Sequence, residues 1–202
     1  MVYKVSRRDY MSEDEFWSLI EESQGEDPQE QLDNLVDALL DMTVEKIAGF
    51  DYVLCKMLER SYTVEMLAVA DIVLDGCTDE GFECFRMWVI SLGRETFENA
   101  LKDPDSLFDA LEKVADEGDE PINAELWYVA GDAYQEMTEK DDDATDRFFS
   151  SFDDDFNEEI EIQPTWTDDD PTGLEQICPK IFDRFYDDPL GYDYYEEDEV
   201  FD

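Results

Sequence analysis

Hydrophobic residues in the first 140 positions recur every three or four residues, which is the spacing of one face of an α-helix. The clearest stripe consists of Leu32, Leu35, Val36, Leu39 and Leu40. Another helix is predicted earlier in the chain, where Ser12 precedes three acidic residues and an apolar face of Phe16, Trp17, Leu19 and Ile20. A serine N-cap and acidic residues in the first turn both stabilise the start of a helix.

Further helices are predicted at 43–58, 62–74, 79–92, 106–114 and 121–137. The segment 62–74 is apolar on all sides, and its length and its Met, Leu and Ala content favour a central helix over a strand. Asp79 is the expected start of one helix, and Pro121 is suited to the first turn of the last long one. Few segments alternate strictly between hydrophobic and polar residues, the pattern that would predict a strand. We therefore predict an all-α fold, a single helical domain of about six to eight helices, with residues 1–140 as its helical core.

The character of the chain changes near residue 141. Residues 1–140 contain 35 acidic and 11 basic residues, whereas residues 141–202 contain 23 acidic and 3 basic residues. This second part also contains Phe148, Phe149, Phe152 and Phe156, and a disordered acidic tail usually lacks such large apolar residues. We expect 141–202 to be an acidic C-terminal extension, partly packed on the core. Its expected elements are a helix at about 144–157, an extended stretch at 159–166 and a short helix from Leu174 to Phe185.

The whole chain has 58 Asp and Glu against 14 Lys and Arg, a formal net charge of −44. That charge repels nucleic-acid backbones and anionic membranes, so neither is expected as a direct partner. With 43% hydrophobic and 13% aromatic residues, the chain can still bury a core. The first residues lack an apolar stretch typical of a signal peptide, and no run approaches the length of a membrane span. The expected location is the cytoplasm.

Histidine is absent, which excludes His-activated nucleophiles and imidazole metal ligands. Cys55, Cys77, Cys84 and Cys178 lack the CxxC spacing of zinc sites. They could pair as two disulfides, but in a cytoplasmic chain reduced thiols are favoured. Asp141, Asp143 and Thr145 imitate the start of a calcium loop that then lacks its glycine and its final glutamate. No catalytic, metal-binding or cofactor-binding residue is predicted.

Two segments resemble a family: FWSLIEES at 16–23 and CTDEGFECFRMWVISLGRETFENALKDPDSL at 77–107. They are similar to an uncharacterised bacterial domain-of-unknown-function family with an FW..LI helix and an SDDGF..FR.WLI..G...F..A...PD motif. The matching positions are Phe16, Trp17, Asp79, Gly81, Phe82, Phe85, Arg86, Trp88, Ile90, Gly93, Phe97, Ala100, Pro104 and Asp105. CPKIFDRF at 178–185 resembles the family's last helix, so the resemblance spans about 12–186. It implies a helical fold and no established activity, and Thr78 and Glu80 depart from it conservatively.

Within that motif, Asp79, Arg86 and Trp88 form a candidate pocket. In a functional interpretation, Arg86 is a bidentate donor that holds an anion or a substrate. In a structural interpretation, Arg86 forms a partly buried ion pair with a carboxylate such as Glu83, Trp88 belongs to the core, and Asp79 is an N-terminal cap. The structural interpretation is favoured because no nucleophile or base lies nearby in the sequence.

The excess of negative charge favours a surface that meets a basic partner protein. We expect a non-enzymatic acidic interaction protein that binds and blocks such a surface. The partner would be a nucleic-acid-binding protein, with the chain imitating nucleic acid, or a toxin or effector, with the chain acting as an immunity-type inhibitor. The alternatives are a small-ligand-binding protein or enzyme with a pocket around Arg86 and Trp88, and acidity that only solvates the protein. The predicted partner-binding clusters are Asp141, Asp142, Asp143, Asp153, Asp154, Asp155, Asp168, Asp169 and Asp170.

Overall fold

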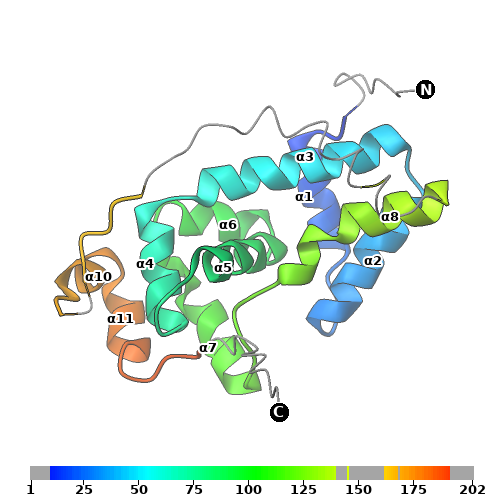
Figure 1. Cartoon of the computed structure of the whole chain (residues 1–202). Coiled ribbons are helices and arrows are strands. Elements are labelled where there is room, and N and C mark those ends of the chain that lie inside the picture. Colours follow the sequence, from blue (N-terminus) through cyan, green and yellow to red (C-terminus); the bar gives the residue numbers. More distant parts are fainter. Residues whose placement is uncertain (1–9, 140–144, 146–161, 168, 192–202) are drawn as a thin grey trace, which may run out of the picture.

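The computed structural model describes residues 10–139, 145, 162–167 and 169–191 (Figure 1). The predicted all-α class is confirmed, because the described residues form ten α-helices and two short 3₁₀ helices. That number exceeds the six to eight helices expected. The elements are α1 (Glu13–Glu22), α2 (Pro28–Leu40), α3 (Val44–Ser61), α4 (Val64–Val73), α5 (Asp79–Ser91), α6 (Arg94–Ala100), η2 (Pro104–Leu107), α7 (Phe108–Glu117), η3 (Ala124–Trp127), α8 (Val129–Thr138), α10 (Thr172–Ile177) and α11 (Pro179–Phe185).

Side-chain caps are present at the starts of three of the first four helices. At α1, the Ser12 hydroxyl accepts from the Glu15 N–H, and the Glu15 carboxylate accepts from the Ser12 N–H, which makes a capping box. Asp27 caps α2, with Pro28 in its first turn. Thr63 caps α4 in the same way. Side-chain hydrogen bonds therefore define the starts of α1, α2 and α4, whereas α3 begins after Thr43 without a side-chain cap.

The helices pack around α5, which is buried on nearly all sides (Figure 1). It contacts α3, α4 and α6, while α2 and α8 pack against each other at one end of the molecule. The core is rich in aromatic side chains, and each large one that is fully buried contributes about 1.5–3 kcal/mol of transfer free energy. Those with essentially no exposed surface include Phe16, Trp17, Phe50, Phe85, Phe97 and Phe185.

The segment 121–137 differs from the single long helix predicted for it. It contains the 3₁₀ helix η3 and then α8, and Pro121 lies before both of them. The cause is Asn123, whose side-chain oxygen accepts from the Leu126 N–H over 3.2 Å and starts a tight turn. The backbone N–H of Asn123 also donates to the Cys84 carbonyl over 3.1 Å, which ties the segment to α5.

The predicted C-terminal helix is two helices, α10 and α11, which meet at Cys178. Pro179 explains the break, because a residue that precedes proline is disfavoured in the helical conformation. Cys178 and Ile181 have no exposed surface, and α10 and α11 both contact α4. The helix predicted at 144–157 lies outside the described residues, apart from Thr145. Among the residues that the structure does describe, no helix combines the length and the apolar character needed to cross a membrane.

Candidate interaction surface

The described residues include 40 Asp and Glu but only 9 Lys and Arg. None of these 40 carboxylates is buried. Carboxylates favour this arrangement because a buried, unpaired charge is costly. The negative charge of this part of the chain is therefore presented to solvent, and to anything that approaches the protein.

The basic residues of the described chain are largely occupied by intramolecular contacts. Lys46 lies 2.6 Å from Glu15, and Arg184 lies 2.7 Å from Glu112. Looser pairs join Lys113 to Glu117, and Lys180 to Asp109, each over 3.7 Å. These pairs neutralise only a minority of the 40 carboxylates, so the surface keeps a large negative field.

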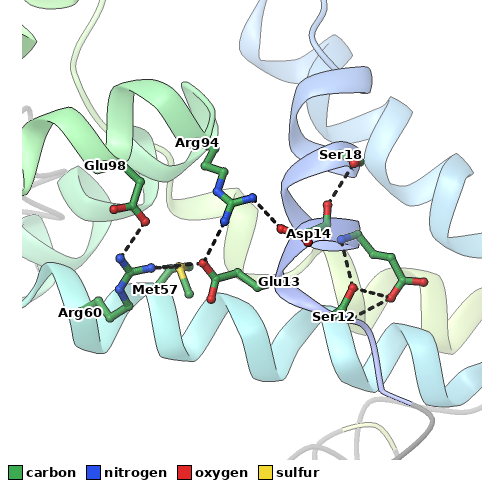
Figure 2. A network of polar contacts seen from close by, with 9 residues as sticks. Ser12, Glu13, Asp14, Ser18, Met57, Arg60, Arg94 and Glu98 are labelled. Atoms are coloured by element: carbon green, nitrogen blue, oxygen red, sulfur yellow. Dashed lines mark hydrogen bonds and ion pairs between the residues drawn. The ribbon is translucent and has the colours of Figure 1, made fainter.

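Two arginines link three helices in the network of Figure 2. Arg60 of α3 and Arg94 of α6 both approach Glu13 at the start of α1, over 3.4 and 3.7 Å. Arg94 also pairs with Asp14 over 2.6 Å, and Arg60 with Glu98 over 2.7 Å. Such partly exposed pairs contribute about 0–1 kcal/mol each. The network orients α1 against α3 and α6, so Arg60 and Arg94 have a structural role.

Arg86 is buried, with 6% of its surface exposed. Its guanidinium donates to the Leu58 carbonyl over 2.7 Å and to the Phe82 carbonyl over 3.2 Å. It also lies over the rings of Phe82 and Tyr62, at 4.5 and 5.1 Å from their centroids. Burial lowers the pKa of Arg86, while carbonyl oxygens and ring faces stabilise its positive charge. The expected ion pair with Glu83 is therefore replaced by hydrogen bonds to backbone carbonyls.

The other two residues of the predicted pocket lie elsewhere. Asp79 is exposed, and the helix cap expected there is supplied by Thr78, whose hydroxyl accepts from the Gly81 N–H over 3.0 Å. Trp88 comes two residues after Arg86, which places it on the opposite side of α5. The groove that Trp88 lines includes neither Asp79 nor Arg86 among its described lining residues.

Trp88 instead lines a small groove between the α1–α2 connection, α5, α7 and the segment 118–123, with a volume of about 160 Å³. We call this the Trp88 groove. Gln31, Ser91 and Asn123 line it too, and each is at least nine-tenths buried. The Gln31 amide nitrogen donates to the Ser91 carbonyl over 2.9 Å, and to the Ile20 carbonyl over 3.3 Å.

Gln31 and Asn123 were not predicted from the sequence. Gln31 precedes Leu35 and Leu39 by one and two helical turns, so it lies on the apolar face of α2. A polar residue in an apolar stripe is a usable signal. Asn123 gives no comparable signal, because its buried position depends on the distant Cys84 carbonyl.

Two adjacent aromatic residues are exposed where η3 meets α8. Trp127 keeps 41% of its surface exposed, and Tyr128 keeps 62%. Exposed aromatic side chains are frequent anchors in protein–protein interfaces. Neither residue belongs to a site predicted from the sequence.

Of the nine aspartates predicted to bind a partner, seven lie outside the described residues: Asp141, Asp142, Asp143, Asp153, Asp154, Asp155 and Asp168. Asp169 and Asp170 are exposed. The Asp170 carboxylate accepts from the hydroxyl and the N–H of Thr172, over 2.6 and 3.2 Å, at the start of α10. These hydrogen bonds lower the pKa of Asp170, which therefore has a local structural role.

The four cysteines are free thiols. Burial raises the pKa of Cys77 and of Cys178 to about 12, so both stay protonated at neutral pH and lack the reactivity of a thiolate. Within the described parts of the chain, no group of three or more carboxylates or thiols is arranged to hold a metal ion.

Comparison with known proteins gives one match. The model of a family described as a protein of unknown function (DUF4240) matches residues 11–136. The match stops before α10 and α11, so it is shorter than the 12–186 expected from the resemblance. No curated protein and no solved structure matches the chain. Because the family model covers more than half of the sequence, this chain belongs to the DUF4240 family.

Proposed function

We propose that this chain is a non-enzymatic acidic interaction protein of the cytoplasm, which binds and blocks a basic surface of a partner protein. The observation that supports the proposal is that none of the 40 carboxylates in the described residues is buried, while only nine basic residues accompany them there. Those basic residues are largely occupied within the fold, by carboxylates or, for Arg86, by carbonyl oxygens. The excess negative charge is therefore free to act on another molecule.

A field of this sign and size would act mainly on association. Complementary charge raises the encounter rate with a basic protein and disfavours acidic ones. The exposed Trp127 and Tyr128 would add short-range contacts once the two proteins have met. In this scheme, charge selects basic partners before contact and raises the association rate, and the aromatic contacts slow dissociation of the complex.

Two forms of blocking fit this description. In the first, the partner is a nucleic-acid-binding protein, and the carboxylates occupy the positions of phosphates. In the second, the partner is a basic toxin or effector, and the chain is its inhibitor. The two differ in one measurable property, which is competition with duplex DNA for the partner.

The alternative is a small-ligand-binding protein or an enzyme with a pocket around Arg86 and Trp88. Two observations disfavour it. The donors of Arg86 are directed to carbonyls of the fold, and the Trp88 groove, at about 160 Å³, is smaller than the roughly 300–1,000 Å³ of most small-molecule sites. The groove suits a single side chain better than a substrate with a cofactor.

The test is affinity capture from the native host at low salt, followed by elution with increasing salt. The matched control is immobilised polyglutamate carrying the same number of charges. A protein retained by the chain but not by polyglutamate is then purified and titrated calorimetrically against the chain, with and without duplex DNA.

The proposal expects a stoichiometric complex whose dissociation constant rises with salt. Replacing Asp141–Asp143, Asp153–Asp155 and Asp168–Asp170 with asparagine should slow association and weaken its salt dependence. If every captured protein binds polyglutamate equally well, or if association is indifferent to salt and to these substitutions, the proposal is wrong.

A further inference from the structure

The Trp88 groove contains two buried amide side chains with unused hydrogen-bonding groups. Gln31 is 6% exposed and Asn123 is 5% exposed. Each uses one half of its amide within the fold: the nitrogen of Gln31 donates to Ser91, and the oxygen of Asn123 accepts from Leu126. Among the described residues, no partner is found for Gln31 Oε1 or for Asn123 Nδ2.

Neither atom is one of the fully buried side-chain nitrogens or oxygens that lack a hydrogen bond, so each is open to solvent from the groove and can bond to water there. Both residues line the groove, so the open atoms are available to a molecule that enters it. Gln31 Oε1 would accept a hydrogen bond, and Asn123 Nδ2 would donate one. The groove thus has one acceptor and one donor fixed in place by the fold.

The size of the groove restricts what can enter. Its volume of about 160 Å³ is close to that of cavities of roughly 150 Å³ that hold a benzene ring. A guanidinium group with its three methylenes has a similar number of heavy atoms as such a ring. The groove can therefore take one long side chain.

The charge of the lining favours a cation. Lys113 is the one basic residue among the described residues that line the groove, and it pairs with Glu117. The acidic residues of the lining are Glu26, Asp27, Glu117, Asp119 and Glu120. The indole of Trp88 adds an aromatic surface, on which a cation is stabilised further.

We propose that the Trp88 groove is the anchor site for an arginine side chain of the basic partner; this rests on the proposed function and names the contact that gives it specificity. The guanidinium enters beside Trp88 and donates to Gln31 Oε1 and to the carboxylates of the rim. A backbone carbonyl of the same partner segment accepts from Asn123 Nδ2.

Arginine fits better than lysine for two reasons. Its planar guanidinium can stack on an indole and donate in several directions at once, whereas an ammonium is a compact and strongly hydrated point charge. The acceptors are also spread around the groove, on Gln31 and on the rim, which suits a forked donor.

The first experiment titrates the full chain with arginine blocked at both ends, as its N-acetyl methylamide, and follows the side-chain amide and indole signals by NMR. Blocked citrulline, a neutral compound of nearly the same shape, and blocked lysine serve as controls. We expect saturable binding of the arginine compound with a dissociation constant on the order of 1 mM. The signals of Gln31, Asn123 and Trp88 should shift, and both control compounds should bind at least about fivefold more weakly.

The second experiment separates the groove from the general negative charge. A rim variant carries Glu26→Gln, Glu117→Gln and Asp119→Asn, three residues that line the groove. A matched variant carries Glu59→Gln, Glu65→Gln and Glu95→Gln, three exposed residues outside the lining. The net charge changes equally in both, so only a local effect can distinguish them.

We expect the rim variant to weaken blocked-arginine binding at least about fivefold more than the matched variant. Gln31→Met, which removes the acceptor at nearly constant shape, should weaken it as well, and its NMR spectrum reports whether the fold is kept. Asn123→Asp keeps the oxygen that caps η3 but replaces the Nδ2 donor with a carboxylate oxygen. It should bind the guanidinium of blocked arginine at least as tightly as the native chain while losing the hydrogen bond to a backbone carbonyl.

Equal binding of arginine and citrulline, equal binding of arginine and lysine, or equal weakening by the two triple variants would overturn the proposal. A basic partner that still binds stoichiometrically in that case would leave the proposed function standing and refute only the anchor site. Saturable arginine binding to the groove, with no basic partner found for the chain, would support the arginine site and refute the proposed function.

Discussion

The guanidinium of Arg86 donates to the backbone carbonyl of Leu58 over 2.7 Å and so links α5 to the last turn of α3. Leu58 is among the last four residues of α3, whose carbonyls lack the usual backbone N–H donor four residues further on. The Ser61 hydroxyl also donates to the Leu58 carbonyl, over 3.2 Å. A cation is also favoured near a helix C-terminus, because the helix dipole is negative there. Arg86 thus caps a helix that ends 25 positions before it in the chain.

Arg86→Ala should lower the free energy of unfolding by about 3 kcal/mol, because a buried carbonyl loses a charged donor and a space opens between Phe82 and Tyr62. Urea denaturation followed by tryptophan fluorescence measures this. Arg86→Lys should be intermediate, since lysine restores the charge without the planar stacking. Unchanged stability of the alanine variant would show that the capping contact has no energetic role.

Asp105 of η2 caps α11 from a distance, because its carboxylate accepts from the backbone N–H groups of Lys180 and Ile181 over 3.0–3.1 Å. Asp105→Ala should lower the free energy of unfolding by about 1–2 kcal/mol, the usual cost of losing an N-cap. Asp109→Asn is the control, because Asp109 also faces Lys180 but is almost fully exposed. Equal effects of the two substitutions in urea denaturation would contradict the capping role.

The elements that were predictable from the sequence are those with local causes. The Ser12 N-cap of α1 and the apolar stripe of α2 each depend on residues close together in the chain, and both predictions hold. The single helix expected at 121–137 is wrong because the Asn123 side chain starts a tight turn there. The backbone of Asn123 is also held by the Cys84 carbonyl, a contact between residues 39 positions apart. Periodicity carries no information about such a tether.

The candidate site likewise depends on contacts between distant residues that the sequence pattern does not show. Trp88 was identified from the sequence, but its pairing with Arg86 was not realised, because residues two apart lie on opposite sides of a helix. The Trp88 groove is assembled from four separate segments, and its buried amides become visible only when those segments are brought together. The charge of the surface, in contrast, follows from composition, since carboxylates without partners must stay exposed.

The pair Glu15–Lys46 predicts a specific pH dependence. The hydrogen bond from Lys46, with those from Ser12, lowers the pKa of Glu15 to about 2, below its usual value of 4.5. A carboxyl whose pKa is lowered by folding stabilises the fold above its unfolded pKa, and this contribution is lost as the pH falls towards the folded value. Glu15→Gln should therefore destabilise the protein at pH 7, and the difference should shrink between pH 4.5 and pH 2.

The size of that difference should be modest, about 0.5 kcal/mol at pH 7, because half of the Glu15 side chain is exposed and water screens the pair. Glutamine can keep the capping-box hydrogen bond, so the substitution isolates the charge. Glu22→Gln is a suitable control, as Glu22 has no ion pair within the described residues. A difference from the native chain that stays constant from pH 7 to pH 3 would refute the assignment.

The melting temperature should rise with monovalent salt. Carboxylates outnumber basic residues more than fourfold in the described residues, and none of them is buried, so repulsion between them opposes the compact state. Raising NaCl from about 10 mM to about 0.15 M shortens the screening length from roughly 30 to 8 Å. We expect an increase of about 5 °C in differential scanning fluorimetry, equivalent to roughly 1–2 kcal/mol.

The matched variant with Glu59→Gln, Glu65→Gln and Glu95→Gln should melt above the native chain at low salt. It should lose that advantage at high salt, because screening removes the repulsion that the substitutions relieve. A melting temperature that is flat or falls with salt would mean that the ion pairs of Arg60 and Arg94 outweigh the repulsion, since salt weakens attraction and repulsion alike.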